Sequence, residues 1–338
     1  MKIIKPSVEY FGAIPTEYNA ALKFIEIAGR TCYKSEDKIT EDSAEEFVRK
    51  LIKAGHLAMI EHSNFVVRTR RIDSLLTSLQ GSIGKYLIAV ATPDYTYIGG
   101  SLTAWYQRLL LENTYKGPFN CFFHIWGNLF GLDKIVFSHG FRDIPKTEWW
   151  QPCLYDEIPK ELHRYSAKFI CDRGVSHELV RHRPCSFAQE STRYVNYGGK
   201  DMEFIEPTDL ENWQDDSYRQ FMLACADAED AYHYMVKPEG PLSPQQARAV
   251  LPNALKTEIV VTADAAEWAH IRKLRTAKAA HPDMQRVMNM MPWEEFLDKQ
   301  TEENKIHRCK KHHKDFTGNI CLECEEEESN IPTAYHEG

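Results

Sequence analysis

The most informative segment of the chain, residues 178–194, reads Glu-Leu-Val-Arg-His-Arg-Pro-Cys-Ser-Phe-Ala-Gln-Glu-Ser-Thr-Arg-Tyr. It carries four basic side chains within 13 positions: Arg181, His182, Arg183 and Arg193. Arginine forks match the oxygens of phosphate groups, and several cations beside an apolar run are costly to bury without an anionic partner. The segment therefore indicates an anion-binding site. A surface ion-pair network with Glu178 and Glu190 is the alternative.

The elements around this segment alternate between strands and helices. We predict a strand over residues 163–171, a turn at 172–174 and a short helix over 175–182. Further along, 216–236 has the periodicity of a long amphipathic helix. Residues 257–263 are β-branched and apolar, which predicts a buried strand.

Two helices after residue 240 carry start signals. Residues 243–246 (Ser-Pro-Gln-Gln) combine a capping residue, a proline at the first position and a glutamine three residues on, and the helix must end near Pro252. Asp264, with Glu267 three residues later, predicts the cap of a helix running to about Lys278.

The N-terminal part predicts a helix over 43–54, with a capping box of Ser43 and Glu46 and an end at Gly55. Residues 55–62 are polar enough for a functional loop, and 64–70 resemble a strand. A helix over 101–112 should carry Trp105, Leu109 and Leu110 on one side, and 119–130 is rich in aromatic residues. Residues 72–160 contain no chemical motif, so we interpret them as an insertion.

Composition narrows the class of protein. The 338 residues are 43% hydrophobic and 12% aromatic, which argues against a chain disordered throughout. A net charge of −8 disfavours a strongly basic nucleic-acid binder. We find neither a secretory signal nor a segment long enough to span a membrane, so we expect a cytoplasmic protein. The nine cysteines are then thiols or metal ligands rather than a disulfide framework.

From residue 302 the chain becomes charged and polar, with four acidic residues at 325–328. This tail holds two ligand pairs with the spacing of a small tetrahedral zinc site: Cys309 and His312, and Cys321 and Cys324. His313 is an alternative ligand. A disordered charged tail with incidental cysteines is the other interpretation.

The motif Arg181-His182-Arg183, followed by seven residues and Ser191, resembles the signature of the flavin-dependent thymidylate synthases. Three further segments resemble family motifs in the expected order: residues 55–62, 247–252 and 268–281. The resemblance covers about 43–70 and 163–293. It leaves out the insertion and the tail.

This resemblance implies an α+β fold, with a mostly antiparallel sheet flanked by helices. We place the synthase domain at residues 1–300, with the insertion at about 72–160 and a tail at 303–338. The family methylates the uracil base of deoxyuridine monophosphate (dUMP) to give dTMP. It uses methylenetetrahydrofolate as carbon donor and FAD reduced by NADPH as hydride source. It forms homotetramers whose active sites combine several subunits.

The resemblance also implies a role for individual residues. Those expected to contact FAD are His56, Glu61, Arg181, His182, Arg183, His270 and Leu274. Those expected to contact the nucleotide are Glu178, Arg181, Gln189, Glu190, Ser191, Arg193, Arg248 and Arg275. By the same resemblance, Arg275 is the catalytic residue that stabilises the ionised uracil ring. The helix start departs from the family pattern, since Asp264 and Ala266 replace an Asn and an Arg that reach flavin in some members.

Two other classes of function compete with this one. A thiol mechanism, as in the cysteine-dependent thymidylate synthases, would need an activated cysteine; Cys185 lies near Arg183, and Cys153 follows Pro152. A nucleic-acid-binding protein could use the same arginines, but the net acidity argues against it. Nucleotide-binding glycine loops of the Walker or dinucleotide type are missing from the sequence.

Overall fold

The computed structural model describes residues 1–70, 87–112, 121–122, 125–130, 151–240, 242–298, 306–308 and 315–317. The chain divides into two compact units, Met1–Met291 and Pro292–Gly338. The sites described below all lie in the first unit.

A four-stranded antiparallel sheet forms the centre of the first unit. Its strands are β2 (Ser7–Ala13), β7 (Arg164–Asp172), β10 (Lys256–Asp264) and β8 (Ser186–Gln189), in that order. β10 lies between β7 and β8, and its apolar β-branched residues are buried on both faces because helices cover both sides of the sheet. The predicted α+β class with a mostly antiparallel sheet is confirmed.

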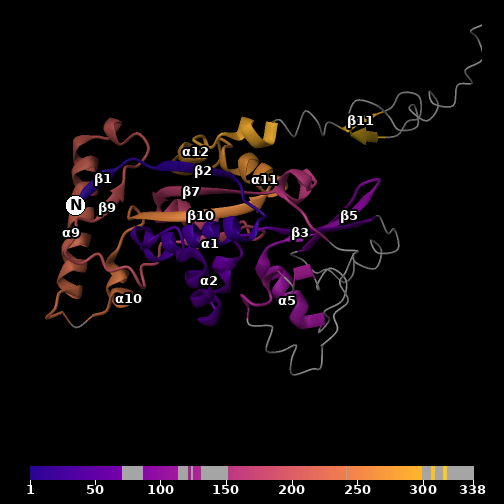
Figure 1. The fold of residues 1–338 in the computed structure, drawn as a ribbon. Helices are drawn as coiled ribbons and strands as arrows, with labels where there is room; N and C mark the ends of the chain where they lie inside the picture. Colours follow the sequence, from indigo (N-terminus) through magenta and orange to yellow (C-terminus); the bar gives the residue numbers. More distant parts are fainter. Residues whose placement is uncertain are drawn as a thin grey trace, which may run out of the picture. The chain divides into compact units, whose positions relative to one another are not determined.

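Helices cover both faces of this sheet (Figure 1). α1 (Tyr18–Tyr33) packs against one face, with α2 (Ser43–Lys53) outside it, whereas α11 (Ala265–Arg275) and α12 (Pro282–Met288) lie on the opposite side. α11 begins directly at the end of β10, so the last residue of the strand also starts the helix. This junction places α11 against one face of the sheet, where the Trp268 indole N–H donates to the Tyr165 oxygen of β7 at 3.0 Å.

A second antiparallel sheet has the order β4 (Leu87–Ala91), β5 (Tyr95–Gly100), β3 (Phe65–Arg70) and β6 (Gln151–Pro152), and α5 (Leu102–Glu112) follows β5. The predicted insertion therefore contributes three of its strands. Phe65 of β3 packs edge-on against Trp105, Phe122 and Trp126. The aromatic residues of the insertion thus bury themselves in a core shared with β3.

The remaining elements join these sheets or lie near the N-terminus. The strand β1 (Lys2–Ile4) pairs in parallel with β9 (Glu203–Ile205) beside the long helix α9 (Asp215–Val236). The other helices and 3-10 turns of this unit are α3 (Leu57–Ile60), α8 (Arg173–Leu179), α10 (Pro244–Ala247), η1 (Glu36–Lys38), η2 (Tyr155–Glu157), η3 (Lys160–Leu162), η4 (Leu210–Asn212) and η5 (Arg248–Val250).

Most predicted elements are confirmed with shifts of a few residues: β3, β7, β10, α2, α5, α9 and α11. The cap at Asp264 is confirmed, because its Oδ1 accepts a hydrogen bond of 2.8 Å from the Glu267 amide. The capping box at Ser243 and Gln246 is also confirmed. Its helix is shorter than expected, since η5 replaces the second turn.

Four local predictions are wrong. Asp42 rather than Ser43 precedes α2, and the Ser43 hydroxyl donates to Glu26 Oε2 at 2.9 Å instead of capping the helix. The turn expected at 172–174 is the beginning of α8, capped by Asp172. The loop expected at 55–62 contains the short helix α3. Leu110 is exposed, because it lies about 100° around the helix from Leu109.

The second unit, Pro292–Gly338, contains a π-helical turn (Glu294–Asp298) and the antiparallel pair β11 (Ile306–Arg308) and β12 (Asp315–Thr317). The predicted zinc ligands lie outside the described residues: Cys309, His312, Cys321 and Cys324. The zinc site therefore stays a prediction.

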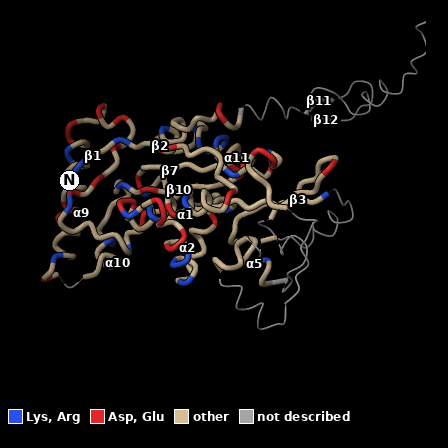
Figure 2. The backbone as a smooth tube through the Cα atoms, viewed as in Figure 1, with Lys and Arg blue, Asp and Glu red and all other residues tan. Residues whose placement is uncertain are grey.

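Charges of both signs are interspersed along the described backbone of the first unit (Figure 2). Among the described residues, no helix is long and apolar enough to cross a membrane.

Candidate active site

Five charged or imidazole side chains meet between the end of α8 and the length of α11. We call this set the Arg275 cluster; it consists of Glu178, His182, Glu267, His270 and Arg275. Arg275 Nη1 donates to Glu178 Oε2 at 2.7 Å, and its Nη2 donates to the Glu178 backbone oxygen at 3.0 Å. Its Nε donates to His182 Nε2 at 3.0 Å. Three directed hydrogen bonds therefore fix the plane of the guanidinium.

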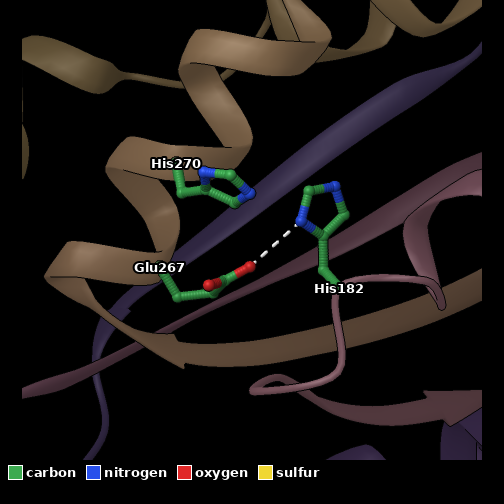
Figure 3. A group of neighbouring side chains, drawn as sticks. All are labelled: His182, Glu267 and His270. Atoms are coloured by element: carbon green, nitrogen blue, oxygen red, sulfur yellow. Dashed lines mark hydrogen bonds and ion pairs between the residues drawn. The ribbon is translucent and has the colours of Figure 1, made fainter.

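The Nδ1 side of His182 faces Glu267, in the first turn of α11 (Figure 3). His182 Nδ1 lies 3.0 Å from Glu267 Oε1, and the ring of His270 approaches edge-on with its centroid 5.7 Å away. The His182 side chain is 5% exposed and that of Glu267 is 12% exposed. Burial lowers the pKa of His182, the contact with Glu267 raises it and the charge of Arg275 lowers it, so that the pKa is lowered on balance. Arg275 Nε donates to His182 Nε2, so that nitrogen keeps its lone pair and the ring is neutral in this arrangement.

The same three residues have the spacing of a metal site. One ligand atom from each of His182, Glu267 and His270 lies within 4.8 Å of the other two. Both ring nitrogens of His182 already form hydrogen bonds, however, and the guanidinium of Arg275 lies beside one of them. A metal ion would have to break a hydrogen bond and tolerate that positive charge. The cluster is better suited to holding Arg275.

A cavity of about 530 Å³, which we call the large cavity, lies beside this cluster. The residues that line it include Glu61, Arg164, Arg183, Cys185 and Asp264. The buried guanidinium of Arg164 donates to the backbone oxygens of Glu61 and Ser63 at 2.7 and 2.8 Å. Asp264, which caps α11, also lines this cavity. Burial raises the pKa of the Glu61 carboxyl.

The cavity has the chemistry of a ligand site. Asn64, at 1% exposure, lines it and donates from Nδ2 to the Leu162 oxygen at 2.8 Å. Its Oδ1 is buried and has no hydrogen-bond partner in the part of the chain that the structure describes. A buried acceptor without a donor is costly, so a ligand N–H group would suit this position. The Arg183 side chain supplies positive charge for phosphate oxygens at the same cavity. These residues fit a ring system with an attached phosphate.

A second cavity, of about 480 Å³, lies at the other end of α8. Arg173, Thr192, Gln245 and Arg248 line it, and we call it the arginine pocket. Arg248 Nη1 donates to Thr192 Oγ1 at a long 3.4 Å. Arg173 Nη1 is buried without a hydrogen-bond partner among the described residues. The pocket thus presents guanidinium donors that are only weakly used.

The segment after β8 is held by internal contacts. Gln189 Nε2 donates to Ser176 Oγ at 2.8 Å, and the buried Glu190 accepts from Tyr197 and Lys256 at 2.8 and 3.2 Å. The Ser191 amide donates to the Cys32 oxygen at 3.0 Å. Gln189, Glu190 and Ser191, which are predicted to bind the nucleotide, therefore also hold the segment after β8 in its conformation.

An aromatic group joins two further predicted site residues. Tyr33 forms a 2.6 Å hydrogen bond with His56 Nδ1, and its ring lies 5.7 Å from that of Tyr194. The guanidinium of Arg193 lies 5.5 Å from the Tyr194 ring centroid. His56 and Arg193 are thus linked through two tyrosines.

Nine of the predicted site residues fall into four neighbourhoods, and Gln189, Glu190 and Ser191 lie apart from them in the segment after β8. Glu178, His182, His270 and Arg275 share the Arg275 cluster, Glu61 and Arg183 share the large cavity, Arg248 lines the arginine pocket, and His56 and Arg193 adjoin Tyr33. Arg181 and Leu274 are exposed, and each directly precedes a residue of the Arg275 cluster in the sequence. Arg248 and Arg275, expected to complete one site, lie in different neighbourhoods.

Sequence reasoning missed four residues that the geometry brings forward: Glu267, Arg164, Asn64 and Arg173. Glu267 entered only as a capping partner, although it precedes His270 by three residues and so shares its helix face. Arg164 is opposite Asp264 in the register of β7 and β10. It is a charged residue at the start of a strand that is otherwise largely apolar. Nothing in the local sequence of Asn64 or Arg173 marks them.

The antiparallel sheets and flanking helices define an α+β protein, and its candidate site is rich in arginine and imidazole side chains. Comparison with known families is more specific. A family model described as "Thymidylate synthase complementing protein" matches residues 16–78 and 157–298, more than half of the chain. The chain belongs to this family, that of the flavin-dependent thymidylate synthases, as the sequence signature predicted.

Individual relatives match over shorter stretches. A flavin-dependent thymidylate synthase from Geobacter sulfurreducens is 38% identical over 110 residues, covering 32% of this chain and 45% of the relative. One from Mycobacterium marinum is 35% identical over 129 residues, covering 34% and 50%. The chain thus spans about half the length of the curated relatives it matches. A crystal structure of Thymidylate Synthase X from Helicobacter pylori with FAD and dUMP aligns with a TM-score of 0.33 and 21% identity, over 41% of this chain and 73% of that one.

The family match clarifies how the large cavity is built. Residues 79–156 lie outside the matched ranges, yet β5, α5 and the residue between them contribute Gly99, Ser101, Thr103 and Gln107 to the cavity wall. The opposite wall comes from matched residues, among them Arg164. The insertion therefore forms part of the candidate site.

Proposed function

We propose that this protein is a flavin-dependent thymidylate synthase. It transfers a one-carbon unit from methylenetetrahydrofolate to C5 of the uracil ring of dUMP and reduces that unit to a methyl group, which gives dTMP. NADPH supplies the reducing equivalents. Family membership and the Arg181-His182-Arg183 motif support the proposal.

The observation that carries the proposal is the fixed guanidinium of Arg275. Uracil C5 is a poor nucleophile, and it becomes a better one when negative charge develops on the ring. A cation held in a set orientation stabilises that charge without reorganising during the reaction. Arg275 has this property, because Glu178 and His182 hold all three of its nitrogens.

The large cavity is the candidate FAD site. Glu61, Asn64 and Arg183 would hold the cofactor there, with His182 and His270 adjoining from the Arg275 cluster. When bound, reduced FAD supplies the hydride. The protein residues bind and orient the ring systems and limit the access of water.

The arginine pocket is the candidate site for the nucleotide phosphate. Arg248 and Arg173 present donors to a space of about 480 Å³, and Thr192 adds a hydroxyl. In this proposal Ser191 and Arg193 also contact the nucleotide phosphate. The homotetramer implied by the family resemblance would let several subunits complete each site.

The first test is an absorbance spectrum of the purified protein, before and after incubation with FAD. NADPH and dUMP are then added without oxygen, and methylenetetrahydrofolate follows. We expect a flavin spectrum that bleaches with NADPH, and dTMP as product by chromatography. UMP in place of dUMP is the matched control for recognition of the sugar.

Each outcome has a defined meaning. Bound flavin and dTMP formation support the whole proposal. Bound flavin without dTMP would limit the protein to another flavin reaction. A protein that does not bind FAD at all contradicts the proposal.

A further inference from the structure

The hydrogen bonds of His182 determine where its proton lies. Arginine nitrogens only donate hydrogen bonds, so His182 Nε2, which lies 3.0 Å from Arg275 Nε, must be the acceptor. A neutral imidazole with a lone pair on Nε2 carries its proton on Nδ1. That proton points to Glu267 Oε1, 3.0 Å away. Glu267, His182 and Arg275 thus form one directed chain of hydrogen bonds (Figure 3 shows its Glu267–His182 part).

We propose that Glu267 is a positioning residue for Arg275 and acts through His182. Its carboxylate selects the Nδ1–H tautomer and fixes the plane of the ring. Nε2 is then presented as the acceptor that orients Arg275. The inference rests on the proposed function, in which Arg275 contacts the uracil ring.

The architecture explains why this chain of contacts is rigid. Glu267 lies in the first turn of α11 and Arg275 in its last turn, so both ends of the chain belong to one helix. His182 lies between them on the turn after α8, and the His182 amide donates to the Leu179 oxygen at 3.0 Å. Asp264 fixes the first turn of α11 by its cap. The helix therefore holds the turn from both ends.

The charged and titratable groups facing His182 are few in the described structure. Glu267, His270 and Arg275 face it from α11, and Glu178 lies across Arg275 on α8. Glu267 raises the pKa of His182, whereas burial, Arg275 and His270 lower it. Protonation of His182 would place a hydrogen on Nε2, so that this N–H group and the Nε–H group of Arg275 would face each other. Acid therefore breaks the contact that orients Arg275.

Two variants separate this role from a structural one. Glu267→Leu removes the acceptor, so His182 can take either tautomer. Glu267→Gln removes the same charge from the first turn of α11 but keeps an oxygen that accepts from Nδ1–H. We expect the Leu variant to lose about 10- to 100-fold in kcat, with the KM for dUMP within a few-fold of wild type. The Gln variant should stay within about threefold.

The pH profile gives a second readout. Both variants remove the charge that raises the His182 pKa, so the acid limb of kcat should move to lower pH in both. Only the Leu variant should have a lower plateau. A residue that merely supports the fold would change the melting temperature and leave the acid limb in place.

NMR of the protein labelled with 15N-histidine reports the tautomer without any activity. His182→Gln identifies the resonance; wild type and Glu267→Gln should show a protonated Nδ1, and Glu267→Leu a mixture. This pattern without dTMP formation would leave the positioning chain intact and remove the proposed reaction. A wild-type plateau in Glu267→Leu, equal losses in both variants, or an Nε2–H tautomer in wild type would each overturn the inference.

Discussion

Arg275 and Arg248 are both predicted to contact the nucleotide, yet their surroundings are opposite. Arg275 uses all three nitrogens in hydrogen bonds of 2.7 to 3.0 Å to Glu178 and His182. Arg248 makes a hydrogen bond of 3.4 Å to Thr192, and its neighbour Arg173 has a buried nitrogen without a partner among the described residues. The Arg275 cluster is internally satisfied, whereas the arginine pocket is not.

This difference separates orientation from binding. A guanidinium that is already held can stabilise charge in a transition state with little reorganisation. Guanidinium groups with unused donors gain most when an anion arrives. We therefore expect changes in the Arg275 cluster to affect kcat and changes in the arginine pocket to affect KM.

The largest effect should come from Arg275→Lys. Lysine keeps the charge but cannot reproduce the planar fork that Glu178 and His182 hold, so kcat should fall about 10²- to 10³-fold. Single-turnover formation of dTMP with prereduced flavin measures this step. Lys273→Ala, an exposed change on the same helix, is the control, and an equal loss there would attribute the effect to the helix.

Removing an arginine of the arginine pocket should have the next largest effect. Arg248→Ala or Arg173→Ala should raise the KM for dUMP about 10- to 100-fold, as expected for a charged hydrogen bond, with kcat little changed. Steady-state kinetics over a range of dUMP concentration gives both constants. Lys237→Ala changes the net charge equally at an exposed site. A fall in kcat at constant KM would abolish the distinction between the two regions.

Glu178→Gln should have a smaller effect. The amide oxygen still accepts from Arg275 Nη1, and only the charge of a 2.7 Å contact is lost. About 1 kcal/mol, or roughly fivefold in kcat, is expected, against a larger loss for Glu178→Ala. If the two variants were equally impaired, the negative charge itself would be what holds Arg275.

The smallest effect should come from Cys185→Ser. Cys185 lines the large cavity near Arg183, but burial and the nearby Glu267 raise the pKa of its thiol. Burial likewise raises the pKa of Cys153 to about 12. Neither thiol is activated as a nucleophile, so the variant should keep dTMP formation within about threefold. Complete loss of dTMP formation, with flavin still bound, would favour the cysteine mechanism.

The fold could be predicted where the local sequence decides it. Residues 257–263 are apolar on both faces and become the central strand β10, and Asp264 caps the next helix. The prediction failed where a distant residue decides. The hydroxyl of Ser43 is used by Glu26, 17 residues earlier, so the expected capping box does not form. Capping signals are ambiguous when the same side chain has a tertiary partner.

The site shows the same division. The arginine-rich motif led to the family from the sequence, because the motif is long and its spacing is specific, and the role of Arg275 stays a prediction from that resemblance. The contact between His182 and Glu267 joins residues 85 positions apart, and Glu267 already had a sufficient explanation as a capping residue. When a side chain has two roles, a local sequence pattern predicts only the role that depends on nearby residues.

The wall that β5 and α5 add to the large cavity has a consequence for selective inhibition. Gln107 and Ser101 lie outside the ranges matched by the family model, but they line the same space as Arg183 of the motif. A compound anchored on the motif side and extended toward Gln107 would contact positions that the family pattern does not constrain. Such a compound could discriminate this protein from relatives that share its signature.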